Sequence, residues 1–219
     1  MSLRTVTLDL LFPPKCPFCQ KILEQPRDPL CPDCQTILPW LTGPAGEKKV
    51  DFSAGCYSPL IYEKRVREAV HRYKFSRVRA YAQPFGTLLT QCVQDHLTQL
   101  PDAVTWTPLS AKRLRTRGFD QAELLARTVG ERLSLPVLPT LVKTRDTQPQ
   151  SELEEESARR ANAMGAYSLR PDVRVEGLRL LLVDDVVTTG ATFSECSSVL
   201  LRSGAAEVYC AAVAQTHRK

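Results

Sequence analysis

Residues 180–192, with the sequence LLLVDDVVTTGAT, limit the fold of this chain more than any other segment. The four apolar residues 180–183 are typical of a short strand that is buried in a parallel sheet. Asp184 and Asp185 follow at the expected carboxyl end of that strand, and a turn of small and hydroxyl residues leads into an apolar-periodic run. A strand, a turn and a helix in this order indicate an α/β protein.

The turn has the composition of a site for anions. Its residues are Thr188, Thr189, Gly190, Ala191 and Thr192. Backbone N–H groups in such a turn, next to a helix N-terminus, suit one phosphate group, and two adjacent acids suit ribose hydroxyls with a divalent cation. An ordinary strand end with a Thr192–Glu195 capping box explains part of the pattern. It does not explain the two acids, the double threonine and the glycine together.

All thirteen positions of this segment resemble the signature with which type I phosphoribosyltransferases bind phosphoribosyl pyrophosphate (PRPP). The resemblance implies that residues 188–192 hold the 5-phosphate and that Asp184 and Asp185 hold the ribose hydroxyls. It also implies Mg²⁺ bound together with PRPP. The expected fold is a type I phosphoribosyltransferase-like parallel sheet flanked by helices, with right-handed crossovers and the ligand at the carboxyl edge of the strands.

Four of the eight cysteines form a Cys-x2-Cys-x11-Cys-x2-Cys pattern near the N-terminus. They are Cys16, Cys19, Cys31 and Cys34. Two such knuckles can supply four thiolates to one tetrahedral Zn²⁺, and a site filled by four protein ligands is structural rather than catalytic. The competing interpretation is a pair of disulfides, which a reducing cytoplasm disfavours. We expect a small zinc module.

Composition and element pattern divide the 219 residues into three parts. We expect a zinc-finger module at 1–40, a linker and N-terminal helical or hood region at 41–102, and a PRPP-binding core at 103–219. In the core, strands are predicted at 103–107, 137–143 and 207–214 besides the signature strand. Helices are predicted at 63–75, 81–97, 120–133 and 192–203. Residues 52–62 suit a strand or hairpin.

The chain lacks the sequence features of a membrane or exported protein. It contains no run of eighteen or more apolar residues and no signal peptide. We therefore expect a cytoplasmic protein without a membrane span. The formal net charge of +5 permits an anionic partner but does not require one.

Basic residues follow the predicted strand 103–107 closely. Arg113 and Arg117 are four residues apart, hence on one side if the segment is helical, and arginine binds pyrophosphate oxygens in a bidentate manner. A solvated basic loop is the alternative. The polar stretch 143–150 suits either a loop that closes over a substrate or a plain connector.

A second basic region covers residues 64–79, with seven lysines or arginines and interleaved Tyr73 and Phe75. This composition is typical of grooves that bind single-stranded nucleic acid. The outer face of a basic amphipathic helix has the same composition. The sequence alone leaves both interpretations open.

Taken together, these segments resemble the ComF family of phosphoribosyltransferase-like proteins, which is associated with bacterial competence and DNA utilisation. The resemblance rests on residues 10–16, which lead into the four-cysteine pattern, on 72–75, on 108–110 with Arg113, on 117–121, on Thr147, Gln150, Arg160 and Asn162, and on the signature. Two departures occur: residues 105–108 read Thr-Trp-Thr-Pro where the family has Val-Pro-Val-Pro, and Asp120 replaces an asparagine.

The resemblance implies PRPP as a ligand, and single-stranded DNA and the competence machinery as partners. It implies catalytic roles for Asp184, Asp185, Arg113 and Arg117, and PRPP binding by Ser110 together with the turn residues 188–192. It leaves open whether a base or an amine is ribosylated, so an active phosphoribosyltransferase in nucleotide salvage or amine ribosylation is the alternative. Because the chain ends five residues after its last predicted strand, we expect any hood over the site to come from the residues up to Leu97.

Overall fold

The computed structural model describes residues 13–76, 78–145 and 163–216. Its main sheet has the strand order β1-β7-β6-β3, and β2 also pairs with β7. All of these pairings are parallel. The strands are β1 (Gly55–Tyr57), β2 (Leu60–Ile61), β3 (Ala103–Trp106), β6 (Arg179–Val187) and β7 (Glu207–Gln215). The predicted α/β fold with a parallel sheet is confirmed.

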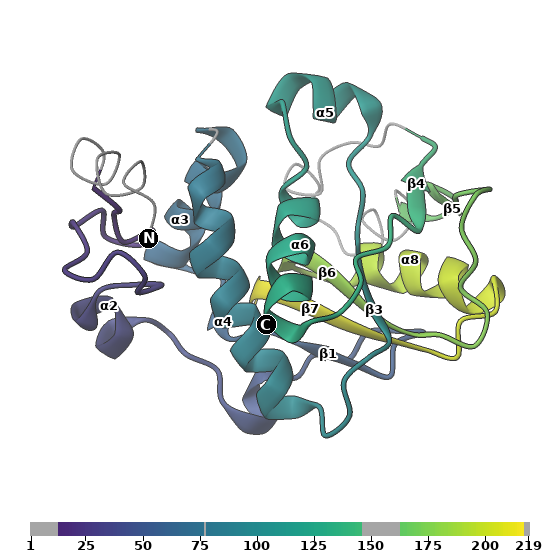
Figure 1. Cartoon of the computed structure of the whole chain (residues 1–219), viewed down its shortest axis with the longest axis horizontal. Coiled ribbons are helices and arrows are strands. Elements are labelled where there is room, and N and C mark those ends of the chain that lie inside the picture. Colours follow the sequence, from purple (N-terminus) through teal and green to yellow (C-terminus); the bar gives the residue numbers. More distant parts are fainter. Residues whose placement is uncertain (1–12, 77, 146–162, 217–219) are drawn as a thin grey trace.

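Helices cover both faces of this sheet (Figure 1). The helices are α2 (Pro32–Ile37), α3 (Lys64–Phe75), α4 (Ala82–His96), α5 (Ala111–Arg117), α6 (Gln121–Leu133) and α8 (Ala191–Arg202), with short 3-10 turns η1 (Gly43–Gly46) and η2 (Arg79–Tyr81). One hydrophobic core joins α4 and α6 to one face, and a second joins α8 to the other. The sheet is therefore the middle of three layers.

The central strand β6 supplies side chains to both cores. Leu181 and Val183 belong to the core on the α4 and α6 side, whereas Leu180 and Leu182 belong to the core on the α8 side. Successive strand residues point to opposite faces, so a strand between two helical layers must be apolar at every position. This explains the uninterrupted apolar run that begins the signature.

Two predicted strands differ from the observed ones because of proline. Within the predicted strand 137–143, Val137 forms a parallel bridge to Val104, but Pro139 interrupts the pairing. Only β4 (Leu141–Lys143) follows, and it pairs antiparallel with β5 (Tyr167–Leu169) in a separate sheet. Likewise, residues 52–62, for which a strand or a hairpin was expected, form a strand in two pieces: Pro59 separates β1 from β2, and both run parallel to β7. Proline lacks the N–H group that a strand needs for pairing.

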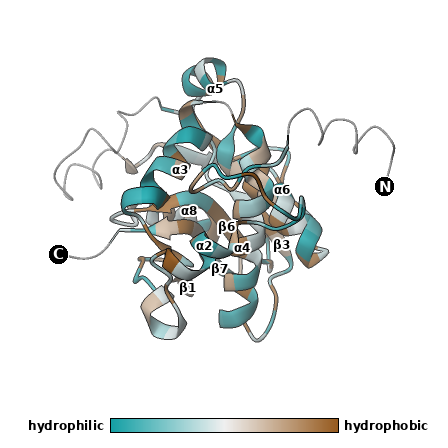
Figure 2. Cartoon of the chain, turned by 90° about the vertical axis from the view of Figure 1, so that its left-hand side faces the viewer, coloured by the Kyte–Doolittle hydropathy of each residue, from teal (hydrophilic) through white to brown (hydrophobic). Residues whose placement is uncertain are grey.

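The N-terminal module packs on α3 and α4, at the left of Figure 1. The ring of Phe18 lies 5.7 Å from the ring of Phe85 in α4. The guanidinium of Arg72 in α3 donates hydrogen bonds to the carbonyl oxygens of Pro17 (2.8 Å) and Phe18 (3.1 Å). Figure 2 views the molecule from this side and shows mostly hydrophilic residues on the outer surface of α3. The module is thus joined to a helix that also reaches the candidate site.

Candidate functional site

A cavity of about 440 Å³ lies at the carboxyl ends of β3 and β6. The predicted residues that line it are Arg113, Arg117, Asp184, Asp185, Thr188, Gly190 and Thr192. Three others, Ser110, Thr189 and Ala191, are not part of its lining. The location agrees with the general rule that ligands of parallel sheets bind at the carboxyl edge of the strands.

Asp184 and Asp185 belong to the last part of β6, which continues to Val187. The sequence pattern had placed them where the strand ends, so this boundary is corrected. Neighbouring β3 ends opposite Val183, and the two acids therefore extend beyond it. Because strand residues alternate, Asp185 follows Leu181 and Val183 toward the α4 and α6 side, and Asp184 points toward the α8 side. Both acids nonetheless line the same cavity.

The surroundings of Asp184 shift its pKa. The carboxylate of Asp184 accepts a hydrogen bond from the backbone N–H of Asp185 at 2.7 Å. Burial and the adjacent charge of Asp185 raise the pKa of Asp184, while a hydrogen bond from the Thr107 side chain opposes that rise. Carboxylate oxygens are the ligands that Mg²⁺ prefers in proteins, so the acid pair fits this cation.

Lys74 is a residue of this site that sequence analysis missed. Its Nζ lies 2.7 Å from Oδ1 of Asp185, and both side chains are largely buried. Its place among seven basic residues favoured nucleic-acid binding or a solvated face. The family resemblance at residues 72–75 was the one sequence feature that set Lys74 apart, and it did not indicate a place in the cavity.

The basic segment after β3 folds into the two-turn helix α5. Ser110 caps it: its Oγ accepts from the N–H of Arg113 at 3.4 Å. Arg113 and Arg117 face the cavity, as their spacing predicted for a helix, whereas Lys112 and Arg115 do not line it. Arg117 donates to Oε1 of Gln121 at 2.9 Å, and its guanidinium lies 5.0 Å from the ring centroid of Phe75.

Asp120 joins this segment to α6. It caps α6 by accepting from the N–H of Ala122 (3.0 Å) and of Glu123 (3.3 Å). Its second oxygen accepts from the N–H of Leu109 at 2.8 Å. Burial raises the pKa of Asp120 to about 6, although these hydrogen bonds favour its ionised form. An aspartate thus serves donors on both segments, where an asparagine has one oxygen.

The turn after β6 requires its glycine. Gly190 has a φ of 85°, and an added Cβ would lie 2.9 Å from Cγ2 of Val50. Gly190, rather than Thr192, is the N-cap of α8. Glu195 accepts from the N–H of Gly165 at 2.8 Å and is not half of a capping box. The hydroxyl of Thr188 is buried without a hydrogen-bond partner among the described residues, as expected of a group that binds a ligand.

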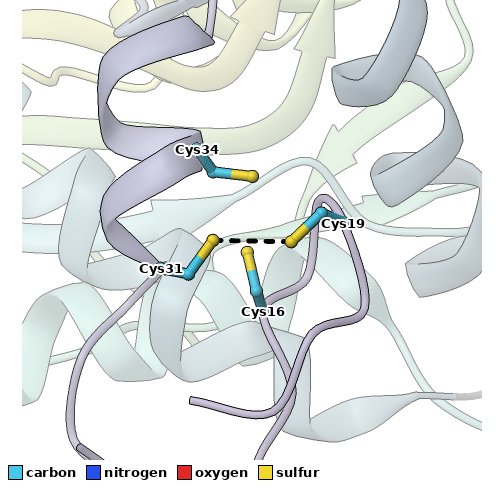
Figure 3. A group of neighbouring side chains, drawn as sticks. All are labelled: Cys16, Cys19, Cys31 and Cys34. Carbon is cyan, nitrogen blue, oxygen red and sulfur yellow. Dashed lines mark hydrogen bonds between the residues drawn. The ribbon is translucent and has the colours of Figure 1, made fainter. Parts of the chain in front are cut away.

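The four predicted zinc ligands come together at one point (Figure 3). Their sulfur atoms all lie within 4.8 Å of one another, and those of Cys19 and Cys31 are 3.4 Å apart. Zinc–sulfur bonds of about 2.3 Å in a tetrahedron require sulfur atoms roughly 3.8 Å apart. The residues form a zinc-binding cluster, and none of these cysteines is in a disulfide.

The segment 143–150, which suits either a loop that closes over the ligand or a plain connector, is described only in part. Lys143 lines the cavity, with Nζ 5.1 Å from the ring centroid of Tyr167. The rest of it, with Thr147 and Gln150, and also Arg160 and Asn162, lies outside the described residues. The closing loop therefore stays a prediction.

Comparisons with known proteins identify the family. A model of the double zinc ribbon domain matches residues 7–48. DNA utilization protein YhgH of Salmonella typhimurium (strain LT2) is 36% identical over 148 residues, 64% of each chain. DNA utilization protein YhgH of Escherichia coli (strain K12) is 34% identical over 156 residues, which are 68% of this chain and 67% of that protein. Competence protein F of Haemophilus influenzae is 34% identical over 145 residues, 64% of this chain and 63% of the relative. The chain belongs to the ComF family.

Solved structures similar to this ComF-family chain have low TM-scores. A glutamine PRPP amidotransferase from Bacillus subtilis has a TM-score of 0.42 at 24% identity, covering 61% of this chain and 26% of that one. An adenine phosphoribosyltransferase from Leishmania tarentolae has a TM-score of 0.39 at 16% identity, covering 63% and 58%. Among the described residues, no helix combines the length and apolar character needed to cross a membrane.

Proposed function

We propose that this ComF-family protein binds PRPP in the cavity at the carboxyl edge of its sheet. One observation carries the proposal: the acid pair of β6, the turn before α8 and two arginines of α5 all line a single cavity. A phosphate held at residues 188–192 would find the unpartnered hydroxyl of Thr188 and the N-terminus of α8. Ribose hydroxyls would bond to Asp184 and Asp185.

The proposed reaction, if the protein is an enzyme, is displacement of pyrophosphate at the anomeric carbon of ribose. A nucleophile forms a bond to this carbon while the carbon–oxygen bond to pyrophosphate breaks, and the electron pair leaves with pyrophosphate. The guanidinium groups of Arg113 and Arg117 would stabilise the charge that develops on the leaving group. Bound Mg²⁺ would neutralise further pyrophosphate charge.

The region that selects the acceptor is proposed to be 41–102. Tyr62, Arg67 and Lys74 of this region line the cavity, which supports a hood from the N-terminal side. The zinc module at 1–40 would stabilise that hood through Arg72. We place the protein in the cytoplasm, where reducing conditions keep the four cysteines available for zinc.

Calorimetry with PRPP and Mg²⁺ tests the binding proposal. We expect Asp184→Asn to weaken PRPP binding by about tenfold or more, because a charged hydrogen bond to a ribose hydroxyl contributes roughly 1.5–3 kcal/mol. Asp172→Asn is the matched control, since that acid is exposed and pairs with Arg170 away from the cavity. Equal PRPP affinity of Asp184→Asn and wild type, with the fold retained, would refute the assignment.

A second proposed function is the handling of single-stranded DNA during competence or DNA utilisation. The names of the relatives support it, and so do Lys64, Arg65 and Arg67, which are exposed on α3. Arg72 and Lys74 are engaged inside the protein, so charge reversal there would disturb packing or the cavity. The informative variant is Lys64→Glu with Arg65→Glu.

Fluorescence anisotropy with a single-stranded oligonucleotide at two salt concentrations tests this function. The α3 variant should bind more weakly than wild type and with a smaller salt dependence, because fewer phosphates are neutralised. Arg132→Glu in α6 with Arg174→Glu in the loop before β6 changes the charge equally at exposed positions away from α3 and is the control. A control variant that loses as much affinity would contradict a binding site on α3.

The alternative is an active phosphoribosyltransferase in nucleotide salvage or amine ribosylation. Release of pyrophosphate from PRPP, measured across a panel of bases and amines, distinguishes it from a protein that only binds PRPP. A turnover that depends on one acceptor would favour the enzyme. The proposal that the protein handles single-stranded DNA includes proteins of the competence machinery as its partners.

A further inference from the structure

A lysine from the N-terminal half of the chain neutralises one of the two acids in the cavity. Nζ of Lys74 lies 2.7 Å from Oδ1 of Asp185, and the two side chains are 22% and 10% exposed. In each of the other ion pairs between described residues, at least one side chain is 40% or more exposed. Because water screens this pair less than a surface pair, its charges interact more strongly.

The backbone of Lys74 is held in place by the helix that faces it. The side-chain amide of Gln121 in α6 donates to the carbonyl oxygen of Lys74 at 3.4 Å. The hydroxyl of the neighbouring Tyr73, itself fully buried, donates to the carbonyl oxygen of Gln121 at 2.8 Å. The end of α3 is thereby fixed against the start of α6, and Lys74 is not a surface lysine that meets an acid by chance.

The pairing changes the charge that the acid pair offers to a cation. Two ionised carboxylates would present a charge of about −2, and a divalent cation needs such a concentration of oxygen ligands. With the Lys74 ammonium on Asp185, the net charge becomes about one unit less negative, and the cation also meets a positive neighbour. Arg117 lines the same cavity and adds a further positive charge.

We propose that Lys74 is the internal counter-cation of Asp185 and that it keeps divalent cations off the acid pair until a phosphorylated ligand is bound. The inference rests on the proposed function, because it concerns the acids assigned to the ribose. A pyrophosphate group brings its own negative oxygens, and Mg²⁺ sites commonly combine one or two carboxylates with substrate phosphates. The cation would therefore enter with the ligand and not before it.

Binding of Mn²⁺ to the zinc-loaded full chain without PRPP tests the inference. Free Mn²⁺ is measured by electron paramagnetic resonance, and zinc already occupies the thiolates, which select it over Mn²⁺. Lys74→Met should bind Mn²⁺ about tenfold more tightly than wild type, or more, because a unit charge a few ångströms away is removed. Lys74→Gln repeats the test if the first variant does not fold.

Three further variants separate the ion pair from other causes. Lys74→Arg keeps the charge and should bind Mn²⁺ as weakly as wild type. Lys74→Met with Asp185→Asn should lose the gain, since the uncovered carboxylate is gone. Lys143→Met removes a positive charge from the same cavity but leaves the ion pair of Asp185 in place. Its gain in Mn²⁺ affinity should therefore be smaller than that of Lys74→Met.

Equal Mn²⁺ affinities of wild type and Lys74→Met would overturn the inference. A gain in Lys143→Met as large as that in Lys74→Met would overturn it too, because general charge would then be the cause. Calorimetry with PRPP is a separate measurement. Failure of the wild type to bind PRPP would refute the proposed function, while the Mn²⁺ comparison would still decide the role of Lys74.

Discussion

The zinc cluster and the cavity at the sheet edge are built in opposite ways. All four zinc ligands come from two knuckles of one small module, with Cys31 and Cys34 at the start of α2. The cavity combines α3, α5, the start of α6, the end of β6 and the turn before α8. The first site depends on spacing within a short segment, and the second depends on the whole fold.

The difference determines how a disturbance spreads between the sites. The zinc module contacts α3 through Arg72, and α3 carries Lys74 into the cavity two residues later. A substitution that disorders the zinc module can therefore alter the cavity through α3. A substitution at Gly190, in the turn before α8, should leave the zinc cluster intact.

Loss of a zinc ligand should have the largest effect. We expect Cys31→Ser to lose stoichiometric zinc and to lower the free energy of unfolding by several kcal/mol, because binding of a structural zinc is coupled to folding. Zinc content and urea denaturation measure the two effects. Cys92→Ser, in α4 and outside the cluster, is the control and should retain zinc. Full zinc content in Cys31→Ser would contradict the four-thiolate site.

A side chain added at Gly190, in the turn that lines the cavity, should lower the stability almost as much as loss of a zinc ligand. Gly190→Ala must keep a φ of 85° and bring Cβ within 2.9 Å of Val50. We expect a loss of about 3 kcal/mol in the free energy of unfolding, from backbone strain and overpacking together. Zinc content should not change.

Gly177→Ala separates the two causes of that loss. Its φ of 73° is also positive, but an added Cβ would meet nothing within 4 Å. The control should cost about 1 kcal/mol, from backbone strain alone. Equal losses in the two variants would mean that the contact with Val50 does not matter.

The link between the two regions should have an intermediate effect. Arg72→Met removes two hydrogen bonds to the carbonyl oxygens of Pro17 and Phe18 while retaining an apolar stem. We expect a loss of about 2 kcal/mol, since hydrogen bonds to charged groups contribute more than neutral ones. Arg65→Met, at an exposed position of the same helix, should change stability by less than about 0.5 kcal/mol. Matching losses would show that Arg72 does not join the module to α3.

The same contrast explains how much the sequence could predict. Cysteine spacing identified the zinc cluster, because its geometry is nearly local. The apolar run before Asp184 and the glycine in the turn identified the central strand, the turn and the parallel sheet. The spacing of Arg113 and Arg117 predicted that they share a side of a helix, although it left the helix itself open.

Features that depend on tertiary contacts could not be predicted in this way. Lys74 is one of seven basic residues in its region, and only the packing of α3 against α6 brings it to Asp185. The strand end at Val187 depends on pairing with β7. Ser110 belongs to a matching motif, yet it caps α5 and does not line the cavity.

The smallest expected effect concerns Asp120, which joins the segment before α5 to α6. Its pKa is raised to about 6 by burial, above the value of about 4 in an unfolded chain. Between these values the folded state binds more protons than the unfolded state, so this group makes stability fall as pH rises. Asp120→Asn has no such titration. The free energy of unfolding of wild type, relative to that variant, should therefore fall by about 1 kcal/mol between about pH 5 and pH 7.5.

Urea denaturation of both proteins at the two pH values measures this difference. Protonation of the zinc ligands at the lower pH affects wild type and variant alike, and it cancels in the comparison. A difference that does not change with pH would mean that Asp120 titrates normally. The joint between α5 and α6 would then be as insensitive to pH between 5 and 7.5 as ordinary surface contacts.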